Sequence, residues 1–298
     1  MQPRLLPAMF CTGVAAAVTQ VLLTREMLVA FLGNELSIGV ILASWLICVG
    51  LGALLARILR LTHLRDPVLV AGLAAATLAL GLALPAQVWA IRSARLLLGV
   101  AAGEYMPLSG ILLSAAITVL PSGLCIGIIF PLACEWHVRR AGAGASPARA
   151  VSSIYTLESL GGMLGGAAMT FLLLPAATPI QIMSVSVAVA ALGAWCLGTR
   201  PPARAALAAL ALALMTVAAV CPGWYQDLEL RAVERRWKAF GVLSDAAAGA
   251  EATRLVKETD TIYQNLALTE AAGQYTLYAD GRVAENHAAF ARAWNSIA

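Results

Sequence analysis

The class of this protein is indicated most clearly by LSIGVILASWLICVGLGALLA, residues 36–56. It runs for 21 residues without one Asp, Glu, Lys, Arg or His. A helix of about 20 apolar residues spans the hydrocarbon core of a bilayer, and it satisfies its backbone hydrogen bonds within the segment. The stretch therefore predicts a transmembrane helix, and the rest of the chain has to suit a membrane.

The same criterion, applied outward, predicts an all-α polytopic membrane bundle of about seven transmembrane helices within residues 1–222. The predicted spans are 7–24, 36–59, 67–91, 107–135, 151–174, 180–198 and 204–222. The fourth contains Pro107 and Pro121, and we expect one long, kinked segment there rather than two helices. Pro175 and Pro179 interrupt the next long apolar run, which predicts two spans joined by a very short turn.

The composition agrees with a membrane protein. Of the 298 residues, 60% are hydrophobic and only 12% are charged, and the mean hydropathy is +0.81. Residues 1–222 carry 12 Lys/Arg and 6 Asp/Glu, whereas residues 223–298 carry 8 and 10. A soluble fold of this size could not cover so much apolar surface. The net charge of +4 is spread over loops, which argues against nucleic acid and leaves the lipid bilayer as the expected partner.

Basic residues between the spans predict the orientation, because short cytoplasmic loops are enriched in Lys and Arg. The N-terminus and the loops after the second, fourth and sixth spans alternate correctly. Their basic residues are Arg4, Arg57, Arg60, Arg65, Arg139, Arg140, Arg149, Arg200 and Arg204. We therefore expect a bacterial-type inner membrane protein with a cytoplasmic N-terminus and an extracytoplasmic tail, residues 223–298. Arg92 and Arg95 break the alternation, and one span more or fewer would reverse the side of the tail.

The tail predicts a small extramembrane region. Residues 223–254 interleave apolar and charged side chains and then small residues, which predicts an amphipathic helix followed by a linker. Within residues 255–298, the runs Thr261–Thr269 and Gln274–Tyr278 are β-prone, and Asp280-Gly281 supplies turn residues. The pattern predicts a β-hairpin. A lone hairpin is marginally stable in water, so this region needs a partner surface or more chain.

Four charged residues are candidates for a polar site in or beside the membrane. Glu158 lies at the mouth of the fifth predicted span, and an acid at membrane depth is a functional candidate by default. The alternative is an interfacial carboxylate, and the same two interpretations apply to Glu135 at the end of the fourth span. Arg25 and Glu26 follow the first span and form either an extracytoplasmic polar cluster or part of a solvated loop.

Four glycines of the fifth span, Gly161, Gly162, Gly165 and Gly166, form two overlapping small-xxx-small pairs. This spacing permits close helix–helix association, which is the expected role, with a substrate path as the alternative. The sequence has no catalytic triad, phosphate loop or dinucleotide fingerprint, and its cysteines lack the spacing of a metal site. We therefore expect no catalytic residue, no metal ligand and no cofactor within the chain.

Three apolar stretches occur in an order that resembles a known family. They are CTGVAAAVTQVLLTREMLVAFLGNE (11–35), VLPSGLCIGIIFPLACEW (119–136) and SSIYTLESLGGMLGGAAMTFLLLP (152–175). A fourth stretch, KETDTIYQNLALTEAAGQYTLYADGRV (257–283), is similar to the N-terminal β-region of spermidine synthases. Together they resemble bacterial proteins in which membrane helices are fused to a spermidine synthase-like, polyamine aminopropyltransferase domain. Residues 255–298 then correspond to a truncated start of that domain.

The resemblance implies that Gln264, with Tyr263 beside it, contacts decarboxylated S-adenosylmethionine, the aminopropyl donor of the family. Ala284 stands where the family has a Gln that faces donor and polyamine. The Gly-rich core and catalytic Asp residues of the family have no counterpart here, so we expect the chain to be catalytically incomplete. It would anchor or partner a separate or downstream synthase-like domain. A transporter of a small molecule or cation, and a membrane scaffold, are the alternative hypotheses.

Overall fold

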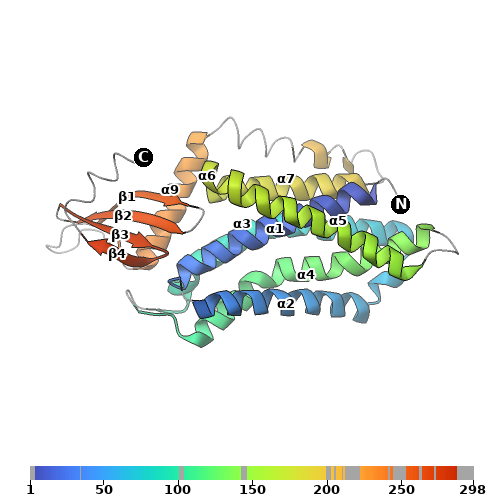
Figure 1. The fold of residues 1–298 in the computed structure, drawn as a ribbon, viewed down its shortest axis with the longest axis horizontal. Coiled ribbons are helices and arrows are strands. Elements are labelled where there is room, and N and C mark those ends of the chain that lie inside the picture. The colour runs from blue at the N-terminus through green and yellow to red at the C-terminus, as the bar shows by residue number, and fades with distance from the viewer. Residues whose placement is uncertain are drawn as a thin grey trace.

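The structure is a computed structural model, a long helix bundle that carries a small β-sheet at one end (Figure 1). It describes residues 4–33, 35–100, 104–141, 146–198, 203–204, 206–209, 211, 222–240, 242–243, 253–261, 264–271 and 273–286. Within these residues, six helical segments are long and apolar enough to cross a membrane. They are α1 (Leu5–Ala30), α2 (Glu35–Ile58), α3 (Asp66–Leu97), α4 (Leu108–Ala141), the run from α5 to α6 (Pro147–Ala176) and α7 (Pro179–Leu197). The prediction of several apolar helices of membrane-spanning length, as expected of a multi-pass membrane protein, is confirmed for six of the seven predicted spans.

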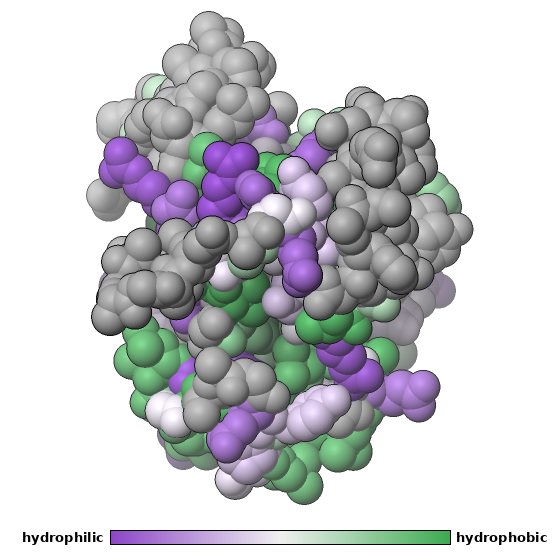
Figure 2. All heavy atoms as spheres, turned by 90° about the vertical axis from the view of Figure 1, so that its left-hand side faces the viewer, coloured by the Kyte–Doolittle hydropathy of each residue, from purple (hydrophilic) through white to green (hydrophobic). Residues whose placement is uncertain are grey.

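The outer surface of the bundle is apolar in the way that lipid contact requires. Leu46 of α2 is 72% exposed, and Phe171, close to the end of the fifth segment, is also 72% exposed. Large apolar patches on a soluble monomer would promote aggregation, whereas a bilayer solvates them. Figure 2 looks onto the end that carries the sheet, where many hydrophilic side chains gather above a more hydrophobic lower part.

Two helices run further than the uncharged segments that predicted them. α1 continues past residue 24 through Arg25 and Glu26, and α3 continues past residue 91 through Arg92 and Arg95. The prediction ended each span at its first charge, because a lone charge in lipid is costly. Here Glu26 and Arg92 pair with each other, so neither helix has to end before its charged residue.

Two prolines shape the passage from α5 to α7. α5 (Pro147–Ala168) widens into a π-helical turn (Met169–Leu173) and ends in α6 (Leu174–Ala176). Pro175 lacks a backbone N–H, so the preceding turn loses a hydrogen bond where it widens. Thr178 then caps α7, because its hydroxyl accepts from the Gln181 N–H while the Gln181 side chain accepts from the Thr178 N–H at 2.9 Å. The predicted turn is therefore very short.

The seventh predicted span, 204–222, lies mostly outside the described residues. Those that are described, 204, 206–209, 211 and 222, are helical. Leu197, the last residue of α7, belongs to the same apolar cluster as Leu5, at the end of the bundle where the chain begins. Helix α9 (Pro222–Ala239) lies at the other end (Figure 1). Leu197 and α9 therefore lie at opposite ends of the bundle, and the beginning of α1 lies at the end opposite the sheet (Figure 1).

The C-terminal region is a four-stranded antiparallel sheet and not the predicted two-stranded hairpin. Its strands, β1 (Arg254–Asp260), β2 (Asn265–Ala271), β3 (Gln274–Ala279) and β4 (Arg282–Asn286), pair in chain order. The predicted hairpin corresponds to β2 and β3. The prediction missed β1 and β4 because they are rich in charged residues, whereas a strand is recognised from apolar alternation. Asp280 and Gly281 form the expected turn, with φ of 46° and 79°.

The sheet packs on α9 and on the end of α1. Trp237 of α9 is fully buried, and its ring centroid lies 5.5 Å from that of Phe240 and 5.2 Å from that of Tyr278 in β3. Val29 of α1 belongs to the same apolar cluster. A Cβ atom on Gly281 would lie 3.0 Å from the Val29 carbonyl oxygen, so glycine lets the turn approach α1. This packing gives the sheet the partner surface that a lone hairpin lacks.

Glycines bring four helices together as two close pairs. In the α1–α5 pair, Gly161 lies against the carbonyl oxygen of Phe10, and Gly165 lies against the same helix one turn further on. In the α2–α4 pair, Gly127 lies against the carbonyl oxygen of Val49. A Cβ atom at any of the three glycines would collide with the facing backbone. Small residues at these positions allow the backbones to approach, as they do in other membrane bundles.

The four glycines predicted to pack are divided between two environments. Gly161 and Gly165 lie at the α1 contact, and a Cβ atom on Gly162 would lie 3.8 Å from the Gly13 carbonyl oxygen. Among the described residues outside its own stretch of α5, no atom lies within 4 Å of a Cβ atom on Gly166. The packing role therefore belongs to the face of α5 that carries Gly161 and Gly165. The second predicted pair, Gly162 and Gly166, is turned away from that face, because adjacent residues of a helix point in different directions.

We predict that Gly161→Ala destabilises the bundle and that Gly166→Ala does not. A methyl group at 161 meets the backbone of α1, and overpacking of this kind costs about 1–3 kcal/mol. At 166 the space is open and alanine favours the helix. Thermal unfolding of the purified protein in detergent compares the two variants. Equal melting temperatures would contradict the placement of Gly161 at the α1–α5 contact.

Candidate functional site

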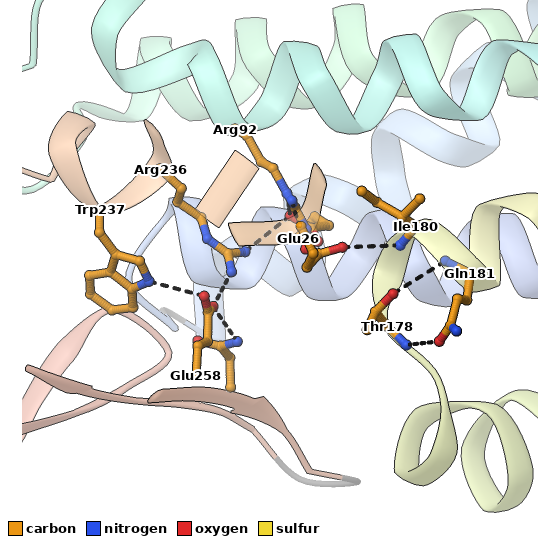
Figure 3. Close-up of polar contacts among 10 residues, drawn as sticks. Glu26, Arg92, Thr178, Ile180, Gln181, Arg236, Trp237 and Glu258 are labelled. Carbon is orange, nitrogen blue, oxygen red and sulfur yellow. Dashed lines mark hydrogen bonds and ion pairs between the residues drawn. The ribbon is translucent and has the colours of Figure 1, made fainter. Parts of the chain in front are cut away.

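Charged side chains from four elements meet where the bundle joins the sheet (Figure 3). α1 contributes Glu26, α3 contributes Arg92, α9 contributes Glu229 and Arg236, and β1 contributes Glu258. We refer to these five residues as the junction cluster. Their side chains are between 4% and 13% exposed, so water solvates them poorly and they depend on each other for compensation.

The pair of Glu26 and Arg92 forms the inner half of the cluster. Arg92 donates through Nη2 to Glu26 Oε1 at 2.6 Å and through Nε to Oε2 at 2.8 Å. Two parallel hydrogen bonds between a guanidinium and a carboxylate form a strong, well-oriented pair. Arg92 also donates through Nη1 to Glu229 at 3.0 Å. The pair therefore ties α1 to α3 and leaves a donor for α9.

Arg236 forms the outer half and connects α1 with the sheet. Its Nη1 donates to Glu26 Oε2 at 3.1 Å, and its Nη2 donates to Glu258. The Glu258 carboxylate also accepts from Trp237 Nε1 at 3.2 Å and from Asn265 Nδ2 at 2.8 Å. One arginine thus bridges a membrane helix and the first strand, and the strand's carboxylate is held by three donors.

Glu229 connects α9 with two further helices. Its Oε1 accepts from Arg92, and its Oε2 accepts from the backbone N–H of Ile180 in the first turn of α7 at 3.2 Å. A helix N-terminus favours such an anion. Burial raises the pKa of Glu229, and the Arg92 guanidinium offsets only part of that rise. Arg25 adds a neighbouring contact, because its Nη2 donates to the Thr261 carbonyl at 2.6 Å.

A cleft of about 270 Å³ opens beside the cluster, between the turn that precedes α7 and the residues Glu229, Arg236, Glu258 and Thr259. The three charged residues that line it are all engaged in pairs within the cluster. In the part of the chain that the structure describes, no three His, Cys, Asp or Glu residues gather as metal ligands would. The geometry is suited to holding elements together.

The structure places Arg25 and Glu26 in this junction and not in a solvated loop. Glu26 is 4% exposed and has two arginine partners. Glu135 lies at the opposite end of the bundle, where it accepts from Arg139 at 2.7 Å. Arg139 also contacts Asp66 at 3.1 Å. Glu135 is therefore part of an ion-paired group at the end of α4.

Arg92 and Arg95, which break the alternation of loop charges, are not free loop residues. Arg92 is neutralised within the junction cluster. Arg95 donates to the Glu104 carbonyl at 2.7 Å and lies over the Phe240 ring, 4.8 Å from its centroid. Both side chains are buried against protein partners, so they carry little information about which side of the membrane they face.

The residues assigned by resemblance lie at the edge of the sheet. Gln264 is exposed in the turn between β1 and β2, where its N–H donates to Thr261 Oγ1 at 3.0 Å and its carbonyl oxygen accepts from the Thr261 N–H at 3.0 Å. Ala284 is exposed in β4. Tyr263 lies outside the described residues. The turn therefore fixes the backbone of Gln264 and leaves its side chain accessible.

Glu158 is separate from the junction. It lines a cavity of about 560 Å³ between α1, α2, α4 and α5. Among the ion pairs of the described residues, none joins Glu158 to Arg149, which lies in the first turn of α5. The structure thus separates the predicted acids, with Glu26 at the junction, Glu135 at the far end and Glu158 inside the bundle.

Sequence reasoning missed Glu229, Arg236 and Glu258. Each lies in a charge-rich amphipathic segment, where a solvated side chain is the ordinary expectation. The available signal was the failure of Arg92 and Arg95 to follow the loop alternation, because arginines on the wrong side of the membrane call for acidic partners. That signal does not identify the partners, because Glu26 lies 66 positions and Glu229 lies 137 positions from Arg92 in the sequence.

Comparison with protein-family models, with curated proteins and with solved structures finds no match to this chain.

We predict that Arg236→Gln loosens the sheet while leaving the bundle folded. The substitution leaves Glu258 without its cation, and removing one partner of a buried ion pair costs about 3 kcal/mol or more. Hydrogen exchange in detergent should show faster exchange of the β1, β2 and β3 amides, with α2 and α4 unchanged. Arg231→Gln is the matched control, because Arg231 is exposed on the same helix. Similar exchange in both variants would contradict the bridging role of Arg236.

Proposed function

We propose that this chain is a membrane anchor that holds a spermidine synthase-like β-region against the extracytoplasmic end of its helix bundle. In this role the bundle supplies position and orientation, and an aminopropyltransferase-like catalytic core, separate or downstream, supplies the chemistry. In this proposal the chain by itself does not catalyse aminopropyl transfer. The observation that carries the proposal is the buried bridge from Glu26 through Arg236 to Glu258.

A bridge of this kind supports anchoring over a flexible tether. A flexible linker would join bundle and sheet through exposed polar residues, without buried charges. Here Arg236 and Glu26 are each 4% exposed, and Trp237 packs between α9 and the sheet. A position fixed to the bundle by buried pairs is useful when a bound partner has to be held at a set distance from the membrane.

The distribution of arginines supports the proposed orientation. Arg57, Arg139 and Arg149 belong to the end of the bundle that contains the N-terminus, and their side chains are at least partly exposed. The arginines of α1 and α3 at the sheet end are engaged with protein groups. When only the short connections between membrane helices and their exposed flanking turns are counted, the positive-inside rule favours a cytoplasmic N-terminus in a bacterial-type inner membrane and an extracytoplasmic sheet.

Gln264 supports the link to the aminopropyltransferase family. The resemblance assigns it to the aminopropyl donor, and its exposed side chain lies at the turn between β1 and β2. A catalytic core that binds at this turn could share a donor molecule with Gln264. The opposite end of the hairpin carries Gln274, which is also exposed but has no assigned role.

We expect a cysteine at Gln264 to react with a membrane-impermeant maleimide in intact cells. A cysteine at Arg57, exposed at the other end of the bundle, should react only after permeabilisation. The five described native cysteines lie within apolar helices and provide a low background, which the unsubstituted chain measures. The reverse labelling pattern would place the sheet in the cytoplasm and contradict the extracytoplasmic part of the proposal.

We further expect the detergent-solubilised chain to bind a separately purified aminopropyltransferase catalytic core that lacks its own N-terminal β-region. Decarboxylated S-adenosylmethionine should increase the affinity of the core for the immobilised chain, measured by surface plasmon resonance. Gln264→Ala should remove the effect of the donor, whereas Gln274→Ala, the control, should preserve it. If the core does not bind the chain with or without the donor, the synthase-like part of the proposal is refuted and the anchoring geometry is unaffected.

A further inference from the structure

The cavity beside Glu158 lies between the two glycine-packed helix pairs. Its volume of about 560 Å³ falls within the range of small-molecule sites. α1 and α5 form one wall, and α2 and α4 form the other. Tyr155, on the rim, is 64% exposed on the apolar flank of the bundle. A ligand would therefore reach the cavity from within the bilayer.

Glu158 is the one charged residue among the described residues that line the cavity. Within the described part of the chain, no side chain or backbone group forms a hydrogen bond or an ion pair with its carboxylate. The other acids in this region of the sequence differ, since Glu26 pairs with Arg92 and Glu135 pairs with Arg139. A carboxylate at membrane depth without a protein partner calls for a proton or a cationic ligand.

Three aromatic rings surround the same space. Trp45 comes from α2, Phe130 from α4 and Tyr155 from α5, and all three line the cavity. The face of an aromatic ring attracts an organic cation, and cages of such rings recognise quaternary ammonium groups. Gln20, from α1, adds a polar group that can accept a hydrogen bond. The remaining lining is dominated by small and aliphatic residues, which suits a hydrocarbon body.

We propose that this cavity binds an organic cation with an apolar body, whose charge is placed between Glu158 and the aromatic rings. A metal ion would need several oxygen ligands, and the charged lining supplies one carboxylate. A neutral lipid chain would leave Glu158 uncompensated. The inference is independent of the anchoring role, because the cavity and the junction cluster share no residue.

Binding of tritiated tetraphenylphosphonium tests the proposal, because this probe is a permanent cation with an aromatic body. The full chain is placed in nanodiscs of zwitterionic lipid, and empty nanodiscs measure partition into lipid alone. The chain should bind the probe saturably. Glu158→Gln should weaken binding by about thirtyfold, the lower end of the effect of truncating a buried charge pair. Glu135→Gln is the matched control and should bind as the unsubstituted chain does.

A second variant keeps the test decisive if Glu158→Gln does not fold. Tyr155→Leu removes one exposed aromatic wall and should weaken binding about fivefold, in line with one cation–π contact. Binding without saturation by the unsubstituted chain would overturn the proposal. It would also be overturned if the probe bound equally well to the unsubstituted chain and to every folded variant at Glu158 or Tyr155.

Discussion

The ion pair between Glu26 and Arg92 is the interaction through which the sheet is fixed to the helix bundle. Each side chain lies in the last turns of a membrane helix, where an isolated charge would be expensive. Pairing removes much of that cost, and it creates a charged platform at the end of the bundle. Arg236 of α9 pairs with Glu26 and also with Glu258 of the sheet, so it connects the sheet to the bundle. The position of the sheet therefore follows from where two helices end.

Buried ion pairs of this type contribute orientation more than stability. The desolvation of each charge offsets much of its attraction to a partner, so an apolar replacement of the whole cluster could be equally stable. The cluster nevertheless accepts few alternative arrangements, because a shift of β1 away from α9 separates Glu258 from Arg236 and Trp237. Apolar packing around Trp237 and Val29 supplies the non-directional part of the attachment. The charged and apolar contacts together define one arrangement of sheet and membrane.

Close packing and open space in the bundle have a common origin. Glycines draw α1 onto α5 and α2 onto α4 until backbone atoms touch. The larger side chains of Trp45 and Phe130 stand between the two pairs, and the cavity beside Glu158 lies there. A bundle with uniform residue sizes would distribute its helices evenly and close this space. The uneven distribution of small and large side chains therefore brings the helices of each pair together and leaves a cavity between the two pairs that can hold a ligand.

Local sequence patterns were sufficient to predict the membrane-spanning helices, six of which the structure describes, and the Asp280-Gly281 turn, because apolar run length and turn chemistry are local properties. The sequence also identified Glu26, Glu135 and Glu158 as acids at the edges of apolar runs, but it could not separate their roles. Their surroundings depend on the packing of the helices: Glu135 pairs with Arg139 four residues away, Glu26 pairs with Arg92 from another helix, and Glu158 lines a cavity. The strands β1 and β4 are also a product of tertiary structure. Their charged residues do not predict a strand, and they become strands by pairing with β2 and β3. The physical reason is that the cost of a buried charge depends on which distant side chain comes to lie beside it.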